Sequence, residues 1–381
     1  MHTIREDFYF LMKKAGERSR KQEFEKNFYG AAIMRFNECK DRKPASQIKQ
    51  EQAILQKHWG CKPLQYYYYS FYRKDCVLTI EEMKKYLPDY FAYYLFFPRI
   101  SKDYSIVCED KGLSYATLKG YNIAQPRMIF RFDFDQFYDE YNGYITSTKV
   151  NEIINESKAN KIFVKPIMGT GGKGIYVFNK KDTYFYDENN VKLDHAYLLK
   201  EVNDGSYIVQ EGIFQSDEMS NIYPHSVNTY RMFTECENGK AKLLVSLLRT
   251  GSGGKQVDNA SSGGLYLKVD PITGVMSDFA YSKNHVKFYE HPDTNFKFKD
   301  SKLSNWEEVK EYILIVTQKF RDIKYLGWDV ACTDNGPMII EINHCPDIEI
   351  MQDHYGGLRD MLHITNPKEW WYSSKFTIKD L

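Results

Sequence analysis

The spacing of apolar residues changes near residue 105, and this change divides the chain. Residues 1 to about 60 carry apolar side chains at helical spacing, among them Phe24, Phe28 and Ala31, within a background rich in Lys, Glu and Gln. Proline is absent until Pro44, which favours uninterrupted helices. The pattern predicts a helical N-terminal region over residues 1–104, with a further helix from Glu81 to Tyr86.

After residue 105, short apolar runs alternate with helical stretches. Strands are predicted at 104–108, 161–166, 174–178, 207–212, 228–236, 241–249, 264–269, 325–333 and 337–343, and a turn that leads into a strand is predicted at 123–131. Helices are predicted at 113–119, 151–159, 195–202 and 306–320. This order of elements indicates an α/β or α+β organisation.

Composition narrows the class of protein. The chain has 381 residues, enough for two or three domains, and its formal net charge of +1 gives no field for nucleic acid or an anionic membrane. Seven cysteines without a Cys-x-x-Cys pair argue against a disulfide framework or a structural zinc site. This cysteine usage fits a reduced cytosol, so we expect a cytoplasmic protein. We find no apolar run long enough for a transmembrane helix and no signal-peptide core.

A glycine-dense loop separates two of the predicted strands. Gly169, Gly171, Gly172 and Gly174 surround Lys173, and such a loop can close its N–H groups on phosphate. A strand follows the loop, which excludes the dinucleotide-binding fingerprint, and neither a Walker sequence nor the kinase words His-Arg-Asp and Asp-Phe-Gly occur. The loop alone fits both a nucleotide site and a β-hairpin with a flexible tip.

The segment 325–343 reads as a hairpin turned at Asn335-Gly336. Glu341 and Asn343 are two residues apart on a strand and share a face, and the turn can bring Asp329 near Glu341. Two carboxylates and an amide oxygen suit Mg²⁺. The alternative is a polar, solvent-facing side of the strand, but the apolar run 338–340 indicates a buried strand, where carboxylates without a cation would be costly.

Taken in order, these motifs resemble the ATP-grasp superfamily over roughly residues 105 to 355. The motifs are Asp110-Lys111, Val164-Lys165-Pro166 before the glycine loop, Gln210-Glu211-Gly212 and Glu341-Ile342-Asn343. The chain looks most like the branch associated with sugar transfer, through the segments 226–231, 257–259, 263–264 and 269–270. The resemblance implies an α+β ATP-grasp fold, with two α+β subdomains sandwiching a nucleotide. We expect this domain over 105–381, with subdomains at about 105–160, 161–215 (the glycine-loop lid) and 216–365.

The same resemblance implies roles for individual residues. Lys111 and Lys165 would reach the ATP phosphates, and the glycine loop would close over them through Gly169, Thr170, Gly171, Gly172 and Lys173. Adenine would lie at the strand end formed by Gln210, Glu211, Gly212 and Ile213, with Glu218 or Asp217 on the ribose. Asp329, Glu341 and Asn343 would hold Mg²⁺ or Mn²⁺, and Arg231 and Arg249 would stabilise an acyl-phosphate.

By this resemblance the chain is an ATP-dependent carboxylate–amine ligase. It would join an amine to a saccharide or other carboxylate in the biosynthesis of a surface polysaccharide such as a capsule, with no nucleic-acid partner. One alternative is a kinase of the same fold, and another is an inactive nucleotide-binding regulator. Lys165 and the three metal positions are intact, which argues against the inactive protein. His225 and His344 are interpreted as structural or substrate-contacting.

Overall fold

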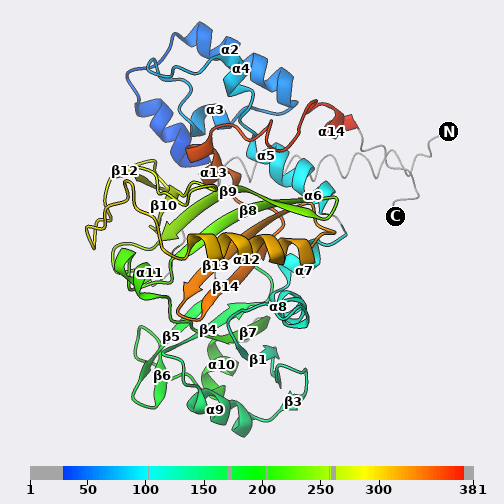
Figure 1. The fold of residues 1–381 in the computed structure, drawn as a ribbon, viewed down its shortest axis with the longest axis vertical. Helices are drawn as coiled ribbons and strands as arrows, with labels where there is room; N and C mark the ends of the chain where they lie inside the picture. Colours follow the sequence, from blue (N-terminus) through cyan, green and yellow to red (C-terminus); the bar gives the residue numbers. More distant parts are fainter. Residues whose placement is uncertain are drawn as a thin grey trace, which may run out of the picture. The chain divides into compact units, whose positions relative to one another are not determined.

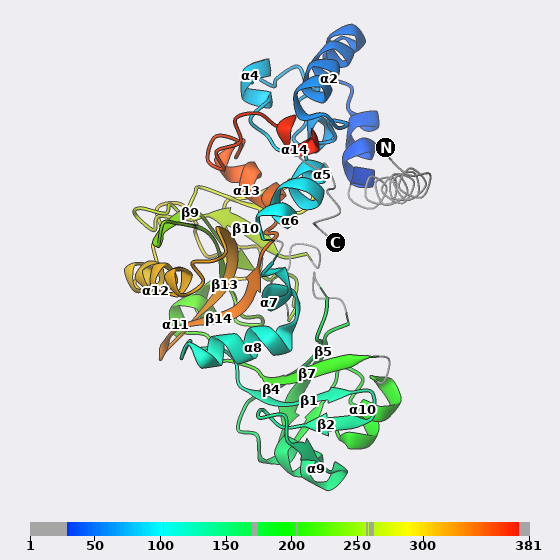
Figure 2. The same ribbon diagram turned by 90° about the vertical axis from the view of Figure 1, so that its right-hand side faces the viewer.

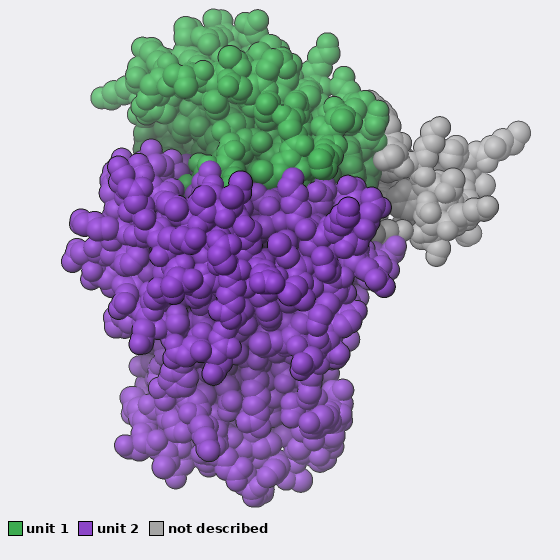
Figure 3. Space-filling view, viewed as in Figure 1, with its two compact units in different colours: residues 1–99, 347–381 green, residues 100–346 purple. Residues whose placement is uncertain are grey.

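The computed structural model describes residues 29–101, 103–169, 174–202, 205–256, 258 and 263–372. The chain divides into two compact units, shown in green and purple in Figure 3. The first comprises Met1–Arg99 with Asp347–Leu381, and the second comprises Ile100–Pro346. The domain limits expected from the sequence remain a prediction. They did not anticipate that the residues from 347 onward would group with the N-terminal region.

The first unit is built from short helices around an aromatic core. Residues 29–38 are helical, as predicted, whereas residues 1–28 lie outside the described part of the chain. The helix predicted at 81–86 is a single turn at 80–83, closed by a capping box between Thr79 and Glu82. That turn is α4 (Ile80–Met83), and the remaining helices are α2 (Ala45–Trp59), α3 (Gln65–Tyr68), α5 (Asp89–Phe91), a π-helical turn (Ala92–Phe96), α6 (Phe97–Ile100), α13 (Ile348–Tyr355) and α14 (Glu369–Tyr372).

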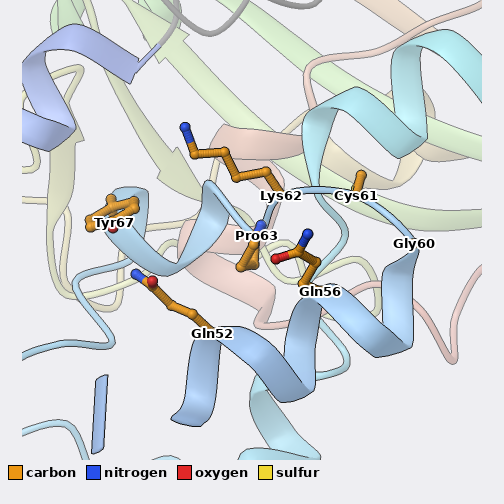
Figure 4. A pocket seen from close by; sticks show the side chains of 7 residues that line it. All are labelled: Gln52, Gln56, Gly60, Cys61, Lys62, Pro63 and Tyr67. Carbon is orange, nitrogen blue, oxygen red and sulfur yellow. The ribbon is translucent and has the colours of Figure 1, made fainter. Parts of the chain in front are cut away.

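Hydrogen bonds from a buried glutamine hold the C-terminal segment in this unit. Gln352 accepts from the Leu87 N–H at 2.7 Å and donates to the Leu87 carbonyl at 3.2 Å. Tyr69 donates to the Glu349 carbonyl at 3.5 Å and packs against Tyr86 with ring centroids 4.8 Å apart. The unit also contains a pocket of about 440 Å³ between α2 and α3, in which none of the predicted site residues lies. Figure 4 shows its lining residues Gln52, Gln56, Gly60, Cys61, Lys62, Pro63 and Tyr67.

The second unit contains two seven-stranded sheets in which every pairing is antiparallel. The first has the order β3-β2-β1-β7-β4-β5-β6, with β1 (Met128–Asp133), β2 (Gln136–Tyr138), β3 (Tyr144–Ile145), β4 (Lys161–Pro166), β5 (Tyr176–Lys181), β6 (Tyr184–Tyr186) and β7 (Ser206–Glu211). Helices α9 (Ser147–Glu156) and α10 (His195–Glu201) lie against it (Figures 1 and 2). Antiparallel pairing throughout identifies the fold class as α+β rather than α/β.

The second sheet has the order β12-β11-β10-β9-β8-β13-β14. Its strands are β8 (Thr229–Glu237), β9 (Lys240–Thr250), β10 (Leu265–Lys268), β11 (Ala280–Ser282), β12 (Lys287–Phe288), β13 (Tyr325–Thr333) and β14 (Gly336–Asn343). Helix α12 (Trp306–Lys319) covers one face, where Trp306 packs on Tyr230 at a centroid distance of 5.5 Å (Figures 1 and 2). Because side chains alternate along a strand, Arg231 and Asp329 point to the other face.

Most predicted elements are confirmed, with limits shifted by a few residues. The predicted strand at 104–108 is wrong: residues 105–109 form helix α7 (Ser105–Glu109), because Val107 and Cys108 pack against the core of the second sheet. The predicted helix at 113–119 is confirmed as α8 (Lys111–Gly120), which Asp110 caps by accepting from the Leu113 N–H. Helix α11 (Asp217–Ile222) and the strands of two or three residues were not predicted.

Candidate active site

The hairpin of β13 and β14 places the predicted metal-binding residues side by side. Its register pairs Asp329 with Glu341 and Gly327 with Asn343, so the expected approach of the two carboxylates is confirmed. Strand β8 flanks β13 on the other side and pairs Arg231 with Asp329. The turn uses Gly336 at a φ of +98°, a conformation that favours glycine. One basic and two acidic side chains therefore lie across three adjacent strands.

Asp329 is the centre of a buried charge network. Its side chain is 4% exposed and accepts from Arg231 Nε at 2.5 Å, Arg231 Nη2 at 3.2 Å and Arg249 Nη2 at 2.9 Å. Burial by itself would raise the pKa of Asp329, but the two guanidinium groups hold that pKa below its ordinary value. Asp258, which was named only within a segment that carries the family resemblance and not as a site residue, lies 3.1 Å from Arg249 Nη2 and accepts from the Thr229 hydroxyl.

Two lysines approach the carboxylates from α8 and from the first sheet. Lys111 Nζ lies 3.6 Å from Glu341 Oε1 and donates to the Gly169 carbonyl at 2.8 Å, at the start of the glycine loop. Lys165 Nζ on β4 donates to Gln210 Oε1 at 3.0 Å. Burial lowers the pKa of Lys165 to about 8; Glu341 works against this shift, whereas Lys111 adds to it. The two lysines predicted to bind the ATP phosphates thus lie on the same side of the site as the carboxylates predicted to bind a metal ion.

The donor set at the hairpin fits a hard divalent cation. Burial and the neighbouring Asp329 raise the pKa of Glu341, whereas Lys111, Arg231 and Lys165 act in the opposite direction. Asn343 Nδ2 is buried and makes no hydrogen bond within the described part of the chain. Among the described residues, no three His, Cys, Asp or Glu side chains cluster as metal ligands. The candidate metal ligands are the two carboxylates of Asp329 and Glu341 and the side-chain amide of Asn343. A cation bound there would relieve the repulsion between the two carboxylates.

The residues predicted to bind adenine lie at the end of β7, where the backbone approaches β4 closely. Gly212 donates to the Lys161 carbonyl at 2.7 Å, and a Cβ at Gly212 would lie 2.9 Å from the Lys161 Cβ, so this close approach needs glycine. The side chains beside it have other partners. Gln210 accepts from Lys165, and Glu211 accepts from Ser157 Oγ at 2.6 Å. The side chains of Gln210 and Glu211 are therefore engaged within the protein.

Some predicted site residues do not join this group or cannot be placed. The structure puts Glu218 on α11, where its carboxylate accepts from the Ser304 N–H at 3.0 Å and the Ser304 hydroxyl at 2.8 Å, just before α12. That is the sheet face opposite Arg231, so the structure does not bring Glu218 together with the lysines and arginines. Gly169 lies at the start of the glycine loop, whereas Thr170, Gly171, Gly172 and Lys173 lie outside the described residues.

Comparison with solved structures gives distant matches. D-alanine–D-alanine ligase from Bacillus anthracis is 14% identical, with 70% of each chain covered and a TM-score of 0.38. The same enzyme from Coxiella burnetii is 12% identical, with 71% of this chain and 60% of that chain covered and a TM-score of 0.39. N5-carboxyaminoimidazole synthetase from Staphylococcus aureus, solved with ADP, is 12% identical, with 67% of this chain and 48% of that chain covered and a TM-score of 0.37.

Comparison with curated protein sequences gave no match. Within the described residues, no helix combines the length and apolar character needed to cross a membrane. The profile of one family, described as sugar-transfer associated ATP-grasp, matches residues 100–365. This range contains both sheets and every residue of the candidate site, so the chain belongs to the sugar-transfer associated ATP-grasp family and has the ATP-grasp fold.

Proposed function

We propose that the chain is a ligase that uses ATP to join a carboxylate to an amine through an acyl-phosphate. The observation that carries this proposal is the continuous set of charged contacts across the site. Lys111 approaches Glu341 at 3.6 Å, Glu341 pairs with Asp329 across the hairpin, and Asp329 is bound by Arg231 and Arg249. Phosphoryl transfer needs groups that neutralise phosphate on one side and groups that hold an acceptor on the other, and this set supplies both.

On the nucleotide side, Lys111 and Lys165 would neutralise the phosphate oxygens of ATP. Asp329, Glu341 and Asn343 would hold Mg²⁺ or Mn²⁺, which supplies charge neutralisation for the same oxygens when it is bound. The pKa of Lys165 is already lowered to about 8, so a phosphate charge beside it would favour the protonated ammonium form. Lys111 donates to the Gly169 carbonyl at 2.8 Å. This hydrogen bond would hold the start of the glycine loop beside the phosphates.

On the acceptor side, a substrate carboxylate oxygen would attack the γ-phosphorus as the bond to the ADP oxygen breaks. The amine nitrogen would then attack the carbonyl carbon of the acyl-phosphate, and phosphate would leave as the nitrogen loses a proton. Arg249 Nη1 makes no hydrogen bond to the described residues, while the Nε and Nη2 atoms of Arg249 are bound to Thr229 and Asp329. A guanidinium group held in this way presents its remaining edge to an acyl-phosphate oxygen.

The substrate class we propose is suggested by the name of the family. Its association with sugar transfer supports a saccharide carboxylate, such as a uronic acid, as one substrate and an amino acid or other amine as the second. The product would be an amide on a surface polysaccharide or on its precursor, made in the cytoplasm where ATP is supplied.

The decisive experiment measures ADP release with amino acids and uronic acids, singly and in pairs. A ligase releases ADP steadily only when an acid and an amine are both present, and the wild-type rate should be lost in Lys165→Met. Lys149→Met is the matched control, because Lys149 is an exposed lysine on α9 that pairs with Glu152 at 3.0 Å. Steady ADP release with a single hydroxyl compound would identify a kinase. Binding of ATP without ADP release from any pair would identify a nucleotide-binding regulator.

A further inference from the structure

His344 directly follows Asn343 and is bound through both ring nitrogens. Its Nε2 lies 2.7 Å from Glu109 Oε1, and its Nδ1 lies 2.8 Å from Ser101 Oγ. A carboxylate only accepts hydrogen bonds, so Nε2 carries the hydrogen, and in the neutral imidazole Nδ1 accepts from the Ser101 hydroxyl. The His344 side chain is 13% exposed, so the ring is held in one orientation.

The partner of His344 belongs to the segment that carries Lys111. Glu109 is the last residue of α7, and Asp110 follows it and caps α8 by accepting from the Leu113 N–H at 2.8 Å. Lys111 begins α8, and its backbone N–H donates to the Ile167 carbonyl at 3.1 Å. The corner between α7 and α8 is therefore fixed to the end of β14 by the bond from His344 to Glu109.

We propose that His344 is a positioning residue that keeps Lys111 at the nucleotide phosphates. By holding Glu109, it keeps the Lys111 ammonium beside Glu341 and beside the Gly169 carbonyl, at distances of 3.6 and 2.8 Å. The predicted effect of His344 on nucleotide affinity rests on the proposed function. The predicted effect of His344 on the position of Lys111 does not, because it can be observed in the nucleotide-free protein. Both effects can be measured separately.

Two other roles for this cluster do not fit the geometry. A serine hydrolase would need an accessible serine, but Ser101 is 2% exposed, so its hydroxyl is out of reach of a substrate. The Cys345 thiol lies 3.2 Å from Nδ1, but burial raises the pKa of Cys345 to about 12. The thiol therefore stays protonated at neutral pH and is not an activated nucleophile.

The first test is lysine labelling with acetic anhydride in the nucleotide-free protein, read by peptide mass spectrometry. In His344→Leu and in Glu109→Ala, Lys111 should react faster than in wild type, by about tenfold if the lost contact couples to it by an amount within the usual range for one network. Lys119 is the internal control, because it lies on the same helix and pairs with Glu140 at 2.8 Å. His344→Gln keeps an N–H for Glu109 and an oxygen for Ser101, so it should restore slow labelling.

Glu109 is 43% exposed, so Glu109→Ala folds even if His344→Leu does not. Unchanged labelling of Lys111 in Glu109→Ala would overturn the proposal. In calorimetry, His344→Leu should weaken ATP binding about tenfold in wild type and not at all in Lys111→Met, because the two residues act through one contact. An undiminished loss in the Lys111→Met background would also overturn it. Absence of ATP binding to the wild-type chain would instead refute the proposed function, and the labelling would still decide the role of His344.

Discussion

The lowered pKa of Lys165 makes a quantitative prediction about protons. Burial brings that pKa to about 8, so near pH 8 about half of the Lys165 side chains in the free protein are neutral. An ATP phosphate beside the ammonium favours its charged form and raises the pKa again. Each ATP that binds near pH 8 should therefore take up about half a proton, whereas near pH 6.5 Lys165 is already charged and the uptake should fall close to zero.

The uptake is measured by isothermal titration calorimetry in two buffers with different ionisation enthalpies. The apparent binding enthalpy then changes between buffers in proportion to the protons exchanged. Comparison with Lys165→Met removes the contributions of all other groups, and Lys149→Met serves as a control for the loss of an exposed lysine. Above about pH 8 the ATP affinity of the wild type should fall towards tenfold per pH unit, because the free protein loses the proton that the complex retains.

A second substitution checks the cause of the shift. Lys111 is a like charge that helps to lower the pKa of Lys165, so Lys111→Met should raise that pKa and reduce proton uptake near pH 8. Equal uptake by wild type and Lys165→Met near pH 8 would refute the reasoning. It would mean either that Lys165 does not face the phosphates or that its ammonium stays charged in the free protein.

The paired carboxylates and the first unit give three further tests. Glu341→Gln should abolish ADP release and the Mg²⁺ dependence of ATP binding in calorimetry; Mg²⁺-dependent binding that persists would contradict the metal assignment. Asp329→Asn deprives the buried Arg231 and Arg249 of their shared carboxylate, so urea unfolding should show a loss of about 3–5 kcal/mol, and an unchanged value would count against the network. Burial and, to a smaller extent, the charge of Asp347 raise the pKa of Glu349 to about 7. Wild-type stability should therefore fall as pH rises from about 4.5 to about 7, and Glu349→Gln should melt higher than wild type near pH 8 but not near pH 4; an equal difference at both pH values would disprove this.

Much of the geometry of the hairpin that carries the candidate metal ligands could be predicted because it is local. A strand sends alternate residues to one face, and a tight turn at Asn335-Gly336 sets the register of the hairpin. Together these two rules are enough to pair Asp329 with Glu341 from the sequence alone, and the observed register agrees. Arg231 could be named only through the family resemblance, because its pairing with Asp329 depends on strand β8, nearly one hundred residues away in the sequence.

The errors have a common physical cause, which is tertiary contact overriding a local pattern. The five residues of α7 have the composition of a strand, but the burial of Cys108 in the core of the second sheet favours a helix there. Glu218 was expected at the ribose only through the family resemblance. Its place on α11 directs the carboxylate to Ser304 instead. Neither the partner of Glu218 nor the link from His344 to Glu109 leaves a short-range signal in the sequence.

The charge of the assembled site explains why a nucleotide and a metal ion should bind together. Four cations face three carboxylates, which leaves one net positive charge; these groups are Lys111, Lys165, Arg231, Arg249, Asp258, Asp329 and Glu341. A triphosphate alone would exceed this charge, and a divalent cation alone would add to it. Bound together, the two ligands would leave the site with only about one net negative charge, and in a partly buried site that balance is worth more than it would be in water. Each ligand should therefore strengthen the binding of the other, and by linkage the two factors must be equal. Measuring Mg²⁺ affinity with and without nucleotide, and nucleotide affinity with and without Mg²⁺, tests this equality directly.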